Sequence, residues 1–325
     1  MNLIVKNEND LRVPAGTKLE KVKEDDFFEV PLGIRLDQFL ASNTAHSRTY
    51  IESLIEEGFV KVNGILILKP SYKVKLDDEI ELTEKKEEIL DINPENLDIN
   101  ILYEDEDILI VDKERGMVVH PSNGHTNGTL VNAIMYHCKD KLSTINGVVR
   151  PGIVHRIDKD TSGILCICKN DFSHHDISLQ FKEHSNVRKY KAVVKGVINS
   201  DCGIINKPIG RDKKFRMRMA IDKNGKNAET HYKVLKRYTN YTYIECELLT
   251  GRTHQIRVHM KDLGHPLLGD LLYGNIDKNF KNLDGQILHA YYLKLIHPRA
   301  RKEIEFTSDL PDYFKEVLHK LDEIQ

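Results

Sequence analysis

The 325 residues, 40% of them hydrophobic, are enough to bury one large core or two smaller ones, and the net charge of −2 by itself favours no class of charged partner. The chain starts MNLIVKNEND, without the basic start and apolar stretch of a secretory signal, and no run of about 18 apolar residues follows. We therefore expect a cytosolic protein with no membrane partner. Five scattered cysteines without a CxxC pair predict reduced thiols and no zinc or other metal site.

Residues 1–30 form an N-terminal extension with no assigned role, and residues 31–83 predict a small folded module. Two groups of apolar residues there lie at helical intervals and predict two short helices. The first group is Leu36, Phe39 and Leu40, and the second is Ile51, Leu54 and Ile55. Further on, Asn63-Gly64 between apolar and β-branched residues is a strong hairpin signal. The module is therefore expected to be of ααβ type.

An acidic segment separates this module from the rest of the chain. From Asp77 to Asp112, 15 acidic residues stand against two lysines, and we interpret residues 84–99 as a solvated linker. Residues 100–325 then read as a strand-rich α+β domain. Strands are expected at residues 107–113, 163–170, 189–198, 229–238, 242–251, 293–298 and 302–308. Helices are expected at residues 129–138, 172–184, 253–264 and 312–324.

HRIDKDTSG, residues 155–163, places charged and polar side chains in a short loop directly before a buried strand. Loops held by a rigid strand are common places for catalytic side chains. Three interpretations compete at this point. Asp158 and Arg156 form a structural ion pair while Thr161 and Ser162 hold the turn, or Asp158 is a nucleophile, or His155 and Ser162 belong to a hydrolase set. The third lacks a GxSxG motif.

The segment from Lys207 to Arg237 is the basic part of the chain, with eleven Lys or Arg against three acidic residues. Its cations alternate with Phe215, Met217 and Met219, which predicts an extended hairpin that turns its cations toward RNA phosphates and packs its apolar side chains. The cations assigned to substrate binding there are Lys207, Arg211, Lys213, Lys214, Arg216 and Arg218.

Two further segments carry candidate functional groups. In TGRTHQIRVHM, Arg257 lies near a helix start, where it could pair with a carboxylate from elsewhere and keep it ionised. In VRKYKAVVKG, Tyr190 lies at a strand start, as packing or as a ring on which a base stacks. No GxxxxGK[ST], GxGxxG or HExxH motif is present, so we expect no cofactor.

Together these segments resemble the RluA-type family of pseudouridine synthases, over about residues 34–306. HRIDKDTSG matches the family's HRLDxxTSG signature with Ile157 in place of Leu. Further matching blocks follow the family's order: GMVVHPSNGHTNGTLVNAI, RKYKAVVKG, PIGRD, GRTHQIRVHM, HPLLGDLLYG and LHAYYLKLIHP. One departure is that residues 113–116, Lys-Glu-Arg-Gly, lack the Pro usual after the Lys. The N-terminal module similarly resembles the S4 RNA-binding domain at Arg35, Leu36, Asp37, Ser47, Arg48, Val62, Asn63 and Gly64.

The resemblance implies a pseudouridine synthase domain with a mixed, mainly antiparallel sheet, and it implies roles for several residues. Asp158 would be the essential carboxylate, Tyr190 the aromatic group beside the target base, and Arg257 the partner of the carboxylate. Leu288 would be an apolar neighbour in the pocket and Arg156 would help to extrude the base, while Arg48 of the S4-like module would contact RNA. The wording of the motifs is most similar to enzymes that modify large-subunit ribosomal RNA, and a monomer is expected.

Two alternatives to this function stay open at the level of the sequence. One is a binding protein, in which a catalytically silent synthase fold serves RNA or ribosome assembly; the other is a synthase that acts on transfer RNA. An Asp-nucleophile hydrolase is a third class, and it would need a metal cluster or a paired acid near Asp158. Asp160 is the only nearby second carboxylate.

Overall fold

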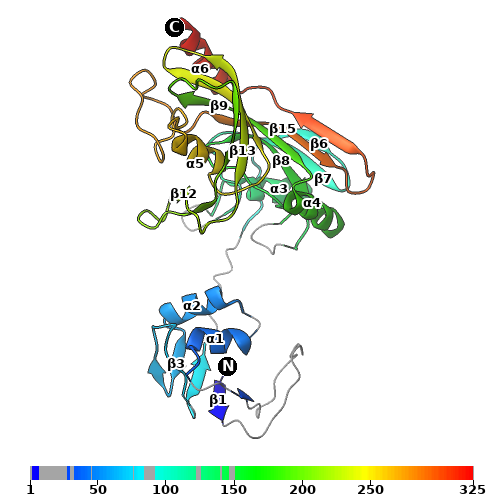
Figure 1. Cartoon of the computed structure of the whole chain (residues 1–325). Coiled ribbons are helices and arrows are strands. Elements are labelled where there is room, and N and C mark those ends of the chain that lie inside the picture. Colours follow the sequence, from blue (N-terminus) through cyan, green and yellow to red (C-terminus); the bar gives the residue numbers. More distant parts are fainter. Residues whose placement is uncertain are drawn as a thin grey trace. The chain divides into compact units, whose positions relative to one another are not determined.

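The computed structural model describes residues 2–6, 28–29, 33–44, 46–75, 77–83, 92–121, 126–139, 141–145 and 151–324. The chain divides into two compact units, Met1–Ile89 and Leu90–Gln325 (Figure 1). Most of the N-terminal extension and the first half of the acidic linker, residues 84–91, lie outside the described residues. No helix within the described parts of the chain has the length and apolar character needed to cross a membrane.

The first unit packs two helices on a small sheet, as the apolar spacing predicts. The helices are α1 (Leu36–Ser42) and α2 (Arg48–Glu56), and the six residues that predicted them are at most 2% exposed. The strands are β1 (Asn2–Lys6), β2 (Phe28–Glu29), β3 (Val60–Val62), β4 (Ile65–Leu66) and β5 (Glu79–Leu82), in the order β2-β1-β5-β3-β4. The predicted hairpin joins β3 to β4, and both Asn63 and Gly64 have the positive φ that its two-residue turn requires. The strands β1 and β2 come from the segment treated as an extension.

The second unit is built around a nine-stranded mixed sheet. In spatial order its strands are β10 (Cys202–Asn206), β13 (Glu229–Arg237), β14 (Tyr241–Leu248), β9 (Val187–Lys195), β15 (Leu288–Ile296), β8 (Ser162–Cys168), β7 (Ile108–Lys113) and β6 (Asn100–Glu104), with β16 (Glu303–Thr307) paired to β15. Only the β15–β8 pair among the described strands of this sheet is parallel. The predicted α+β class with a mainly antiparallel sheet is confirmed, and each of the seven expected strands is present.

Helices cover both faces of this sheet at its centre, and the four predicted helices are all present: α3 (Leu130–Cys138), α4 (Asp171–Glu183), α5 (Gln255–Asp262) and α6 (Asp312–Glu323). Every residue of β8 is buried, because successive side chains point to opposite faces and both faces are packed. Leu165 and Ile167 join the core that includes α3 and α5, whereas Ile164 and Cys166 face Ile177 of α4. The sheet therefore fixes rigidly the loop that precedes β8.

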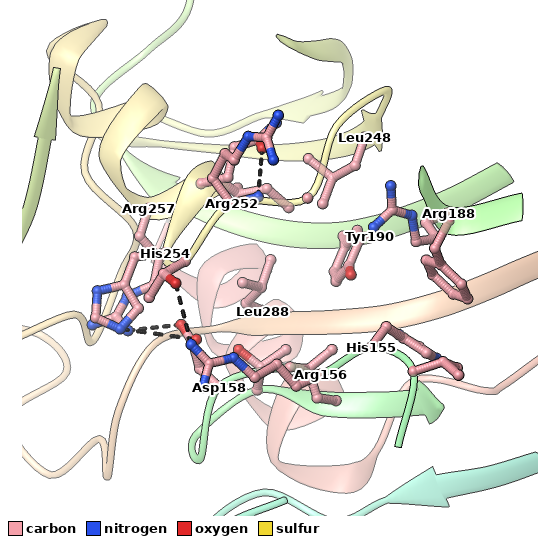
Figure 2. Close-up of a pocket in the computed structure, with 18 of the residues that line it drawn as sticks. His155, Arg156, Asp158, Arg188, Tyr190, Leu248, Arg252, His254, Arg257 and Leu288 are labelled. Carbon is pink, nitrogen blue, oxygen red and sulfur yellow. Dashed lines mark hydrogen bonds and ion pairs between the residues drawn. The ribbon is translucent and has the colours of Figure 1, made fainter. Parts of the chain in front are cut away.

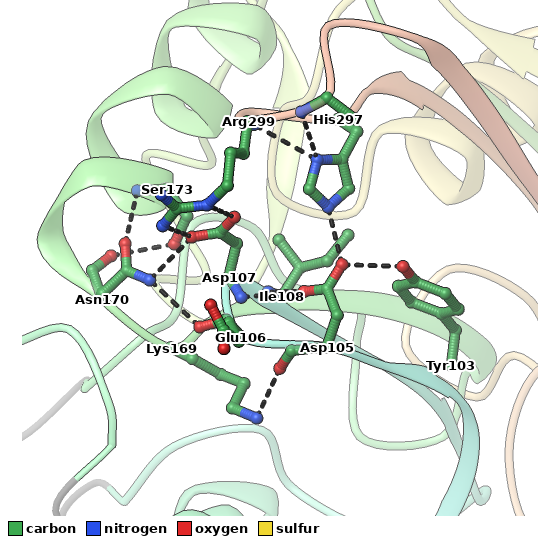
Figure 3. A network of polar contacts seen from close by, with 11 residues as sticks. Tyr103, Asp105, Glu106, Asp107, Ile108, Lys169, Asn170, Ser173, His297 and Arg299 are labelled. Carbon is green, nitrogen blue, oxygen red and sulfur yellow. Dashed lines mark hydrogen bonds and ion pairs between the residues drawn. The ribbon is translucent and has the colours of Figure 1, made fainter.

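A polar network ties the β6–β7 turn to the turn after β15 (Figure 3). Asp105 accepts from Tyr103, His297 and two backbone N–H groups, and Arg299 donates to both oxygens of Asp107. Backbone N–H groups donate to His297 Nδ1, so its Nε2 carries the proton given to Asp105. Every carboxylate oxygen of these two residues already accepts a hydrogen bond. We therefore assign this Asp-Asp-His cluster to the fold rather than to a cation.

Gly163 is the point where the loop enters β8, and its conformation excludes a side chain. Its φ is 118°, and a Cβ built there would lie 2.2 Å from the Ala290 carbonyl oxygen of β15. We expect Gly163→Ala to lower the free energy of unfolding of the second unit by about 3 kcal/mol or more, from backbone strain and the clash with β15. Urea denaturation measures this change.

Gly264→Ala is the matched control, because Gly264 also has a positive φ but a Cβ added to it would meet no described atom within 4 Å. It should cost only about 1 kcal/mol, the strain of the left-handed backbone. Equal losses for the two variants would contradict the close packing of the loop entrance.

Candidate active site

A cavity of about 470 Å³ opens beside the HRIDKDTSG loop (Figure 2). The loop supplies Asp158, strand β9 supplies Arg188 and Tyr190, strand β15 supplies Leu288, and the start of α5 supplies Arg257. These segments are far apart in sequence, and the central strands of the sheet bring them together. All five residues to which the resemblance assigns a role in the synthase domain thus line one cavity: Asp158, Tyr190, Arg257, Leu288 and Arg156.

Arg257 forms ion pairs with two carboxylates, one in the cavity and one buried behind it. Its Nη1 donates to Asp158 Oδ2 at 2.8 Å, while its Nε and Nη2 donate to the two oxygens of Asp270 at 2.7 and 3.0 Å. Asp270 is 2% exposed and also accepts from the backbone N–H groups of Leu272 and Tyr273. Burial alone would lower the pKa of Arg257, but the hydrogen bonds to Asp270 and the charge of Asp158 raise it. The guanidinium is therefore a permanent cation with a fixed orientation.

A buried lysine also holds the loop that carries Asp158. Lys113 of β7 is 2% exposed, and its Nζ donates to the carbonyl oxygens of Glu114, Met117 and Lys159. The backbone N–H of Gly116 donates to the same Lys159 oxygen. Asp158 is thus positioned by backbone contacts on one side and by Arg257 on the other. In the sequence, Lys113 was noted only because the Pro that usually follows it is missing. A lysine at the end of an apolar strand could have indicated a buried structural role.

Tyr190 and Leu288 form apolar walls next to the carboxylate. They are 7% and 4% exposed, and they lie on the adjacent strands β9 and β15. Burial raises the pKa of Tyr190, so its phenol is neutral at neutral pH. Among the described residues no hydrogen-bond partner engages its hydroxyl, which leaves both the ring and the hydroxyl for a ligand.

The geometry separates the three interpretations of the loop. His155 Nε2 accepts a backbone hydrogen bond from Cys166, its ring stacks on Phe181, and burial lowers its pKa to about 3. Ser162 instead bonds to His289 and Tyr313. His155 and Ser162 are therefore not paired, and the hydrolase set lacks its geometry.

The ion pair between Arg156 and Asp158, which one of the three interpretations requires, is likewise absent from the described contacts. Arg156 is exposed at the mouth of the cavity and donates to Thr253 Oγ1 at 3.2 Å, while Asp158 is paired with Arg257. Thr161 does help to hold the turn, because its backbone N–H donates to the Asp158 carbonyl oxygen.

The basic segment forms a hairpin, but the expected alternation is wrong for two of its three apolar side chains, because only Met219 packs, against the cluster around Ile209 and Tyr273. Strands β11 (Ile209–Arg211) and β12 (Met219–Ile221) are short, so residues 212–218 form the turn and have no sheet face on which to pack. Phe215 and Met217 are consequently 57% and 81% exposed. Asp212 rigidifies the turn by accepting from the backbone N–H groups of Lys214 and Phe215, and the Arg218 guanidinium lies over the Phe215 ring.

Two of the candidate RNA-binding cations are engaged by carboxylates. Lys207 Nζ lies 2.6 Å from Asp262, and Arg48 donates through Nε and Nη2 to the buried Asp37 of the first unit. Arg211 donates to the Arg216 carbonyl oxygen, which further orders the turn. Lys213 and Lys214 are exposed and have no ion pair among the described residues.

Comparison with known proteins identifies the family to which the chain is similar. The model of the RNA pseudouridylate synthase family matches residues 107–262, and the S4 domain model matches residues 34–80. An uncharacterised RNA pseudouridine synthase of Bacillus subtilis is 50% identical over 288 residues, which are 88% of this chain and 94% of that protein. Ribosomal large subunit pseudouridine synthase D of Zymomonas mobilis is 43% identical over 293 residues, 87% of this chain and 92% of that protein.

A solved structure agrees with the sequence relatives. Human RNA pseudouridylate synthase domain containing 1 superimposes with a TM-score of 0.54 at 28% identity, covering 66% of this chain and 84% of that one. The matched family segment contains Asp158, Tyr190 and Arg257. This chain therefore belongs to the RNA pseudouridine synthase family and carries an S4 domain ahead of its synthase domain.

Proposed function

We propose that this synthase modifies uridines of large-subunit ribosomal RNA, with Asp158 as the essential carboxylate. The observation that carries the role of Asp158 is its ion pair with Arg257 inside the cavity, beside two apolar walls. The proposed substrate is supported by relatives named ribosomal large subunit pseudouridine synthase D, at 43% identity from Zymomonas mobilis and 38% from Haemophilus influenzae.

The reaction sets the requirements that these residues meet. The bond between uracil N1 and ribose C1′ breaks, the uracil turns, C5 bonds to C1′, and the proton on C5 is replaced by one on N1. No atom is gained or lost, so no co-reactant is needed. A carboxylate serves this sequence as a nucleophile on C1′ or C6, or as the base that removes the C2′ proton. Each of these routes needs Asp158 ionised and directed into the cavity.

The neighbours of Asp158 fit the remaining tasks. Arg257 fixes the direction of the carboxylate, because Asp270 holds the guanidinium on its other side. Tyr190 offers a flat, neutral ring for the uracil, and Leu288 helps to exclude water that would intercept the detached base. Arg156 at the cavity mouth is placed to fill the gap that the flipped uridine leaves in the RNA.

RNA contacts beyond the cavity are proposed for the exposed turn of the basic hairpin. Lys213, Lys214 and Arg216 extend from a turn that Asp212 orders, so they present charge without a large entropy cost. Arg218 and Arg211 contribute to the same surface. We give Lys207 and Arg48 smaller parts, since each already has a carboxylate partner.

Asp158→Asn should abolish pseudouridine formation, because the amide is neither a nucleophile nor a base. The measurement is carbodiimide mapping by primer extension on ribosomal RNA from cells that carry wild type, a deletion or the variant. Asp160→Asn is the matched control two residues away in the same loop, and it should retain the modification. Stops that vanish in the deletion and in Asp158→Asn, and return with wild type, support the proposal.

If every ribosomal pseudouridine persists in the deletion strain, the proposed ribosomal substrate is contradicted. The same mapping on transfer RNA would then name the alternative substrate. Stops that vanish in the deletion but persist in Asp158→Asn would contradict the role of Asp158.

Removing the charges of the hairpin turn should weaken RNA binding without changing the chemical step. For the triple variant Lys213→Gln, Lys214→Gln and Arg216→Gln, the slope of log Kd against log salt concentration should fall by about 2, since each phosphate contact to single-stranded RNA contributes about 0.7. The control removes three exposed lysines elsewhere, by Lys278→Gln, Lys281→Gln and Lys302→Gln. Equal slopes for the two triple variants would show that the turn has no special part in binding.

A further inference from the structure

Arg188 is a buried cation in the cavity that the reaction scheme does not use. It lies on β9 two residues before Tyr190, so both side chains point from the same face of the strand into the cavity (Figure 2). The residue is only 8% exposed, and its Nε is fully enclosed without a hydrogen-bond partner. No described residue accepts a hydrogen bond from the guanidinium or pairs with it through a carboxylate. The guanidinium carbon lies over the ring of Phe181, 5.2 Å from the ring centroid.

The other two buried cations among the described residues of the second unit are compensated, which makes Arg188 an exception. Arg257 has two carboxylates and Lys113 has three carbonyl oxygens. A buried guanidinium without a partner costs folding free energy, and it cannot escape this cost by losing its proton. Burial and the charge of Arg252 both lower the pKa of Arg188, so its surroundings disfavour the charge. An uncompensated group of this kind in a ligand cavity indicates that a ligand supplies the missing anion.

The part of the cavity around Arg188 has the charge distribution of an anion-binding site. Asp158 is the only carboxylate among the described lining residues, against five cations: Arg156, Lys182, Arg188, Arg252 and Arg257. The charge of Arg257 is paired with the Asp158 carboxylate. Arg252 lines the cavity near Arg188, and its Nε is used by the Asn227 carbonyl oxygen while its terminal nitrogens have no described partner.

The backbone is also shaped around the guanidinium. A Cβ on Gly251 would lie 2.7 Å from Arg188 Nη1, so the absence of a side chain there gives the guanidinium its space. Gly251 directly precedes Arg252, and the same turn therefore accommodates one arginine and presents the other. Two arginines without a carboxylate match a phosphate, whose oxygens accept paired hydrogen bonds from planar guanidinium groups. A neutral uracil edge would leave both charges uncompensated.

We propose that Arg188, assisted by Arg252, binds a backbone phosphate next to the target uridine. The assignment rests on the proposed function, because RNA is the polyanion that brings a phosphate into this cavity together with the flipped nucleotide. The anchor has a mechanical purpose. Once the glycosidic bond is broken, the uracil is free but the ribose is still part of the RNA chain, and a held phosphate keeps C1′ opposite Asp158 while the base turns.

The first test measures RNA affinity and turnover for Arg188→Gln on an unmodified large-subunit ribosomal RNA transcript, by filter binding over a salt series and by tritium release from [5-³H]uridine. We expect kcat/KM to fall about 10-fold or more and the salt slope of log Kd to fall by about 0.7, the loss of one phosphate contact. Arg188→Lys should recover part of the loss, because it keeps the charge but not the paired geometry.

Lys189→Gln is the matched control, since its side chain leaves the next position of β9 and faces Glu247 at 3.6 Å. It should bind and turn over like wild type. Thermal unfolding separates ligand binding from a structural role: removing an uncompensated buried charge should leave the Tm of Arg188→Gln unchanged or raise it. A lower Tm, or a salt slope equal to that of wild type, overturns the proposal.

A second test identifies the phosphate directly and does not depend on turnover. The Arg188 Nε–H signal in NMR spectra should shift on addition of uridine 3′,5′-bisphosphate and not on addition of uridine at the same concentration. Equal shifts with both would assign Arg188 to the base or sugar and overturn the phosphate site. If wild type releases no tritium from the ribosomal transcript, the proposed substrate fails, whereas the shift still decides the phosphate site.

Discussion

Arg257 is shared between two carboxylates, and the cavity is organised around this sharing. Asp270 takes two of its hydrogen bonds inside the protein, which leaves one terminal nitrogen directed at Asp158. A guanidinium held by one carboxylate can orient a second, less buried one without a change in its own position. The side chain of Asp270 is 1% exposed, whereas that of Asp158 is 25% exposed. The inner pair supplies rigidity, and the outer pair supplies a reactive group that a ligand can reach.

The rest of the fold holds the backbone of the loop that carries Asp158. It also gathers cations at the end of the cavity away from this carboxylate. Strand β8 is buried on both faces, Gly163 packs against β15, and Lys113 holds the backbone next to Asp158. From Asp158 the cavity passes along Tyr190 to Arg188, where the cations have no carboxylate among the described residues. In the proposed complex the ribose lies at the Asp158 carboxylate, and the two groups bonded to it extend to different walls of the cavity, the base to the Tyr190 ring and the phosphate to the arginines.

The parts of this arrangement that follow from local patterns were predicted from the sequence. Period-two and helical spacing predicted the main strands and helices, and the position of Arg257 near a helix start predicted that it would pair with a carboxylate. Asp270 and Lys113 were missed because their contacts join segments 13 and 46 residues apart, which only the folded chain brings together. The basic hairpin was partly wrong for a local reason: alternation was taken to mean packing, but the strands stop at Arg211 and resume at Met219. In the sequence Arg188 is only one charge in a basic run, because its burial depends on α4 and on Gly251.

The central claim is that Asp270 makes Arg257 a fixed partner for Asp158, and Asp270→Asn tests it most directly. The Asn side chain can still accept from Leu272 and Tyr273 through Oδ1, so the turn is kept, but its amide N–H would face the Arg257 Nε donor. The measurement is kcat and KM for tritium release, with the exposed Asp284→Asn as control. The account predicts a fall in kcat of about 100-fold with little change in KM, since the carboxylate is misplaced while the RNA contacts remain. An unchanged kcat in a folded Asp270→Asn protein would contradict it.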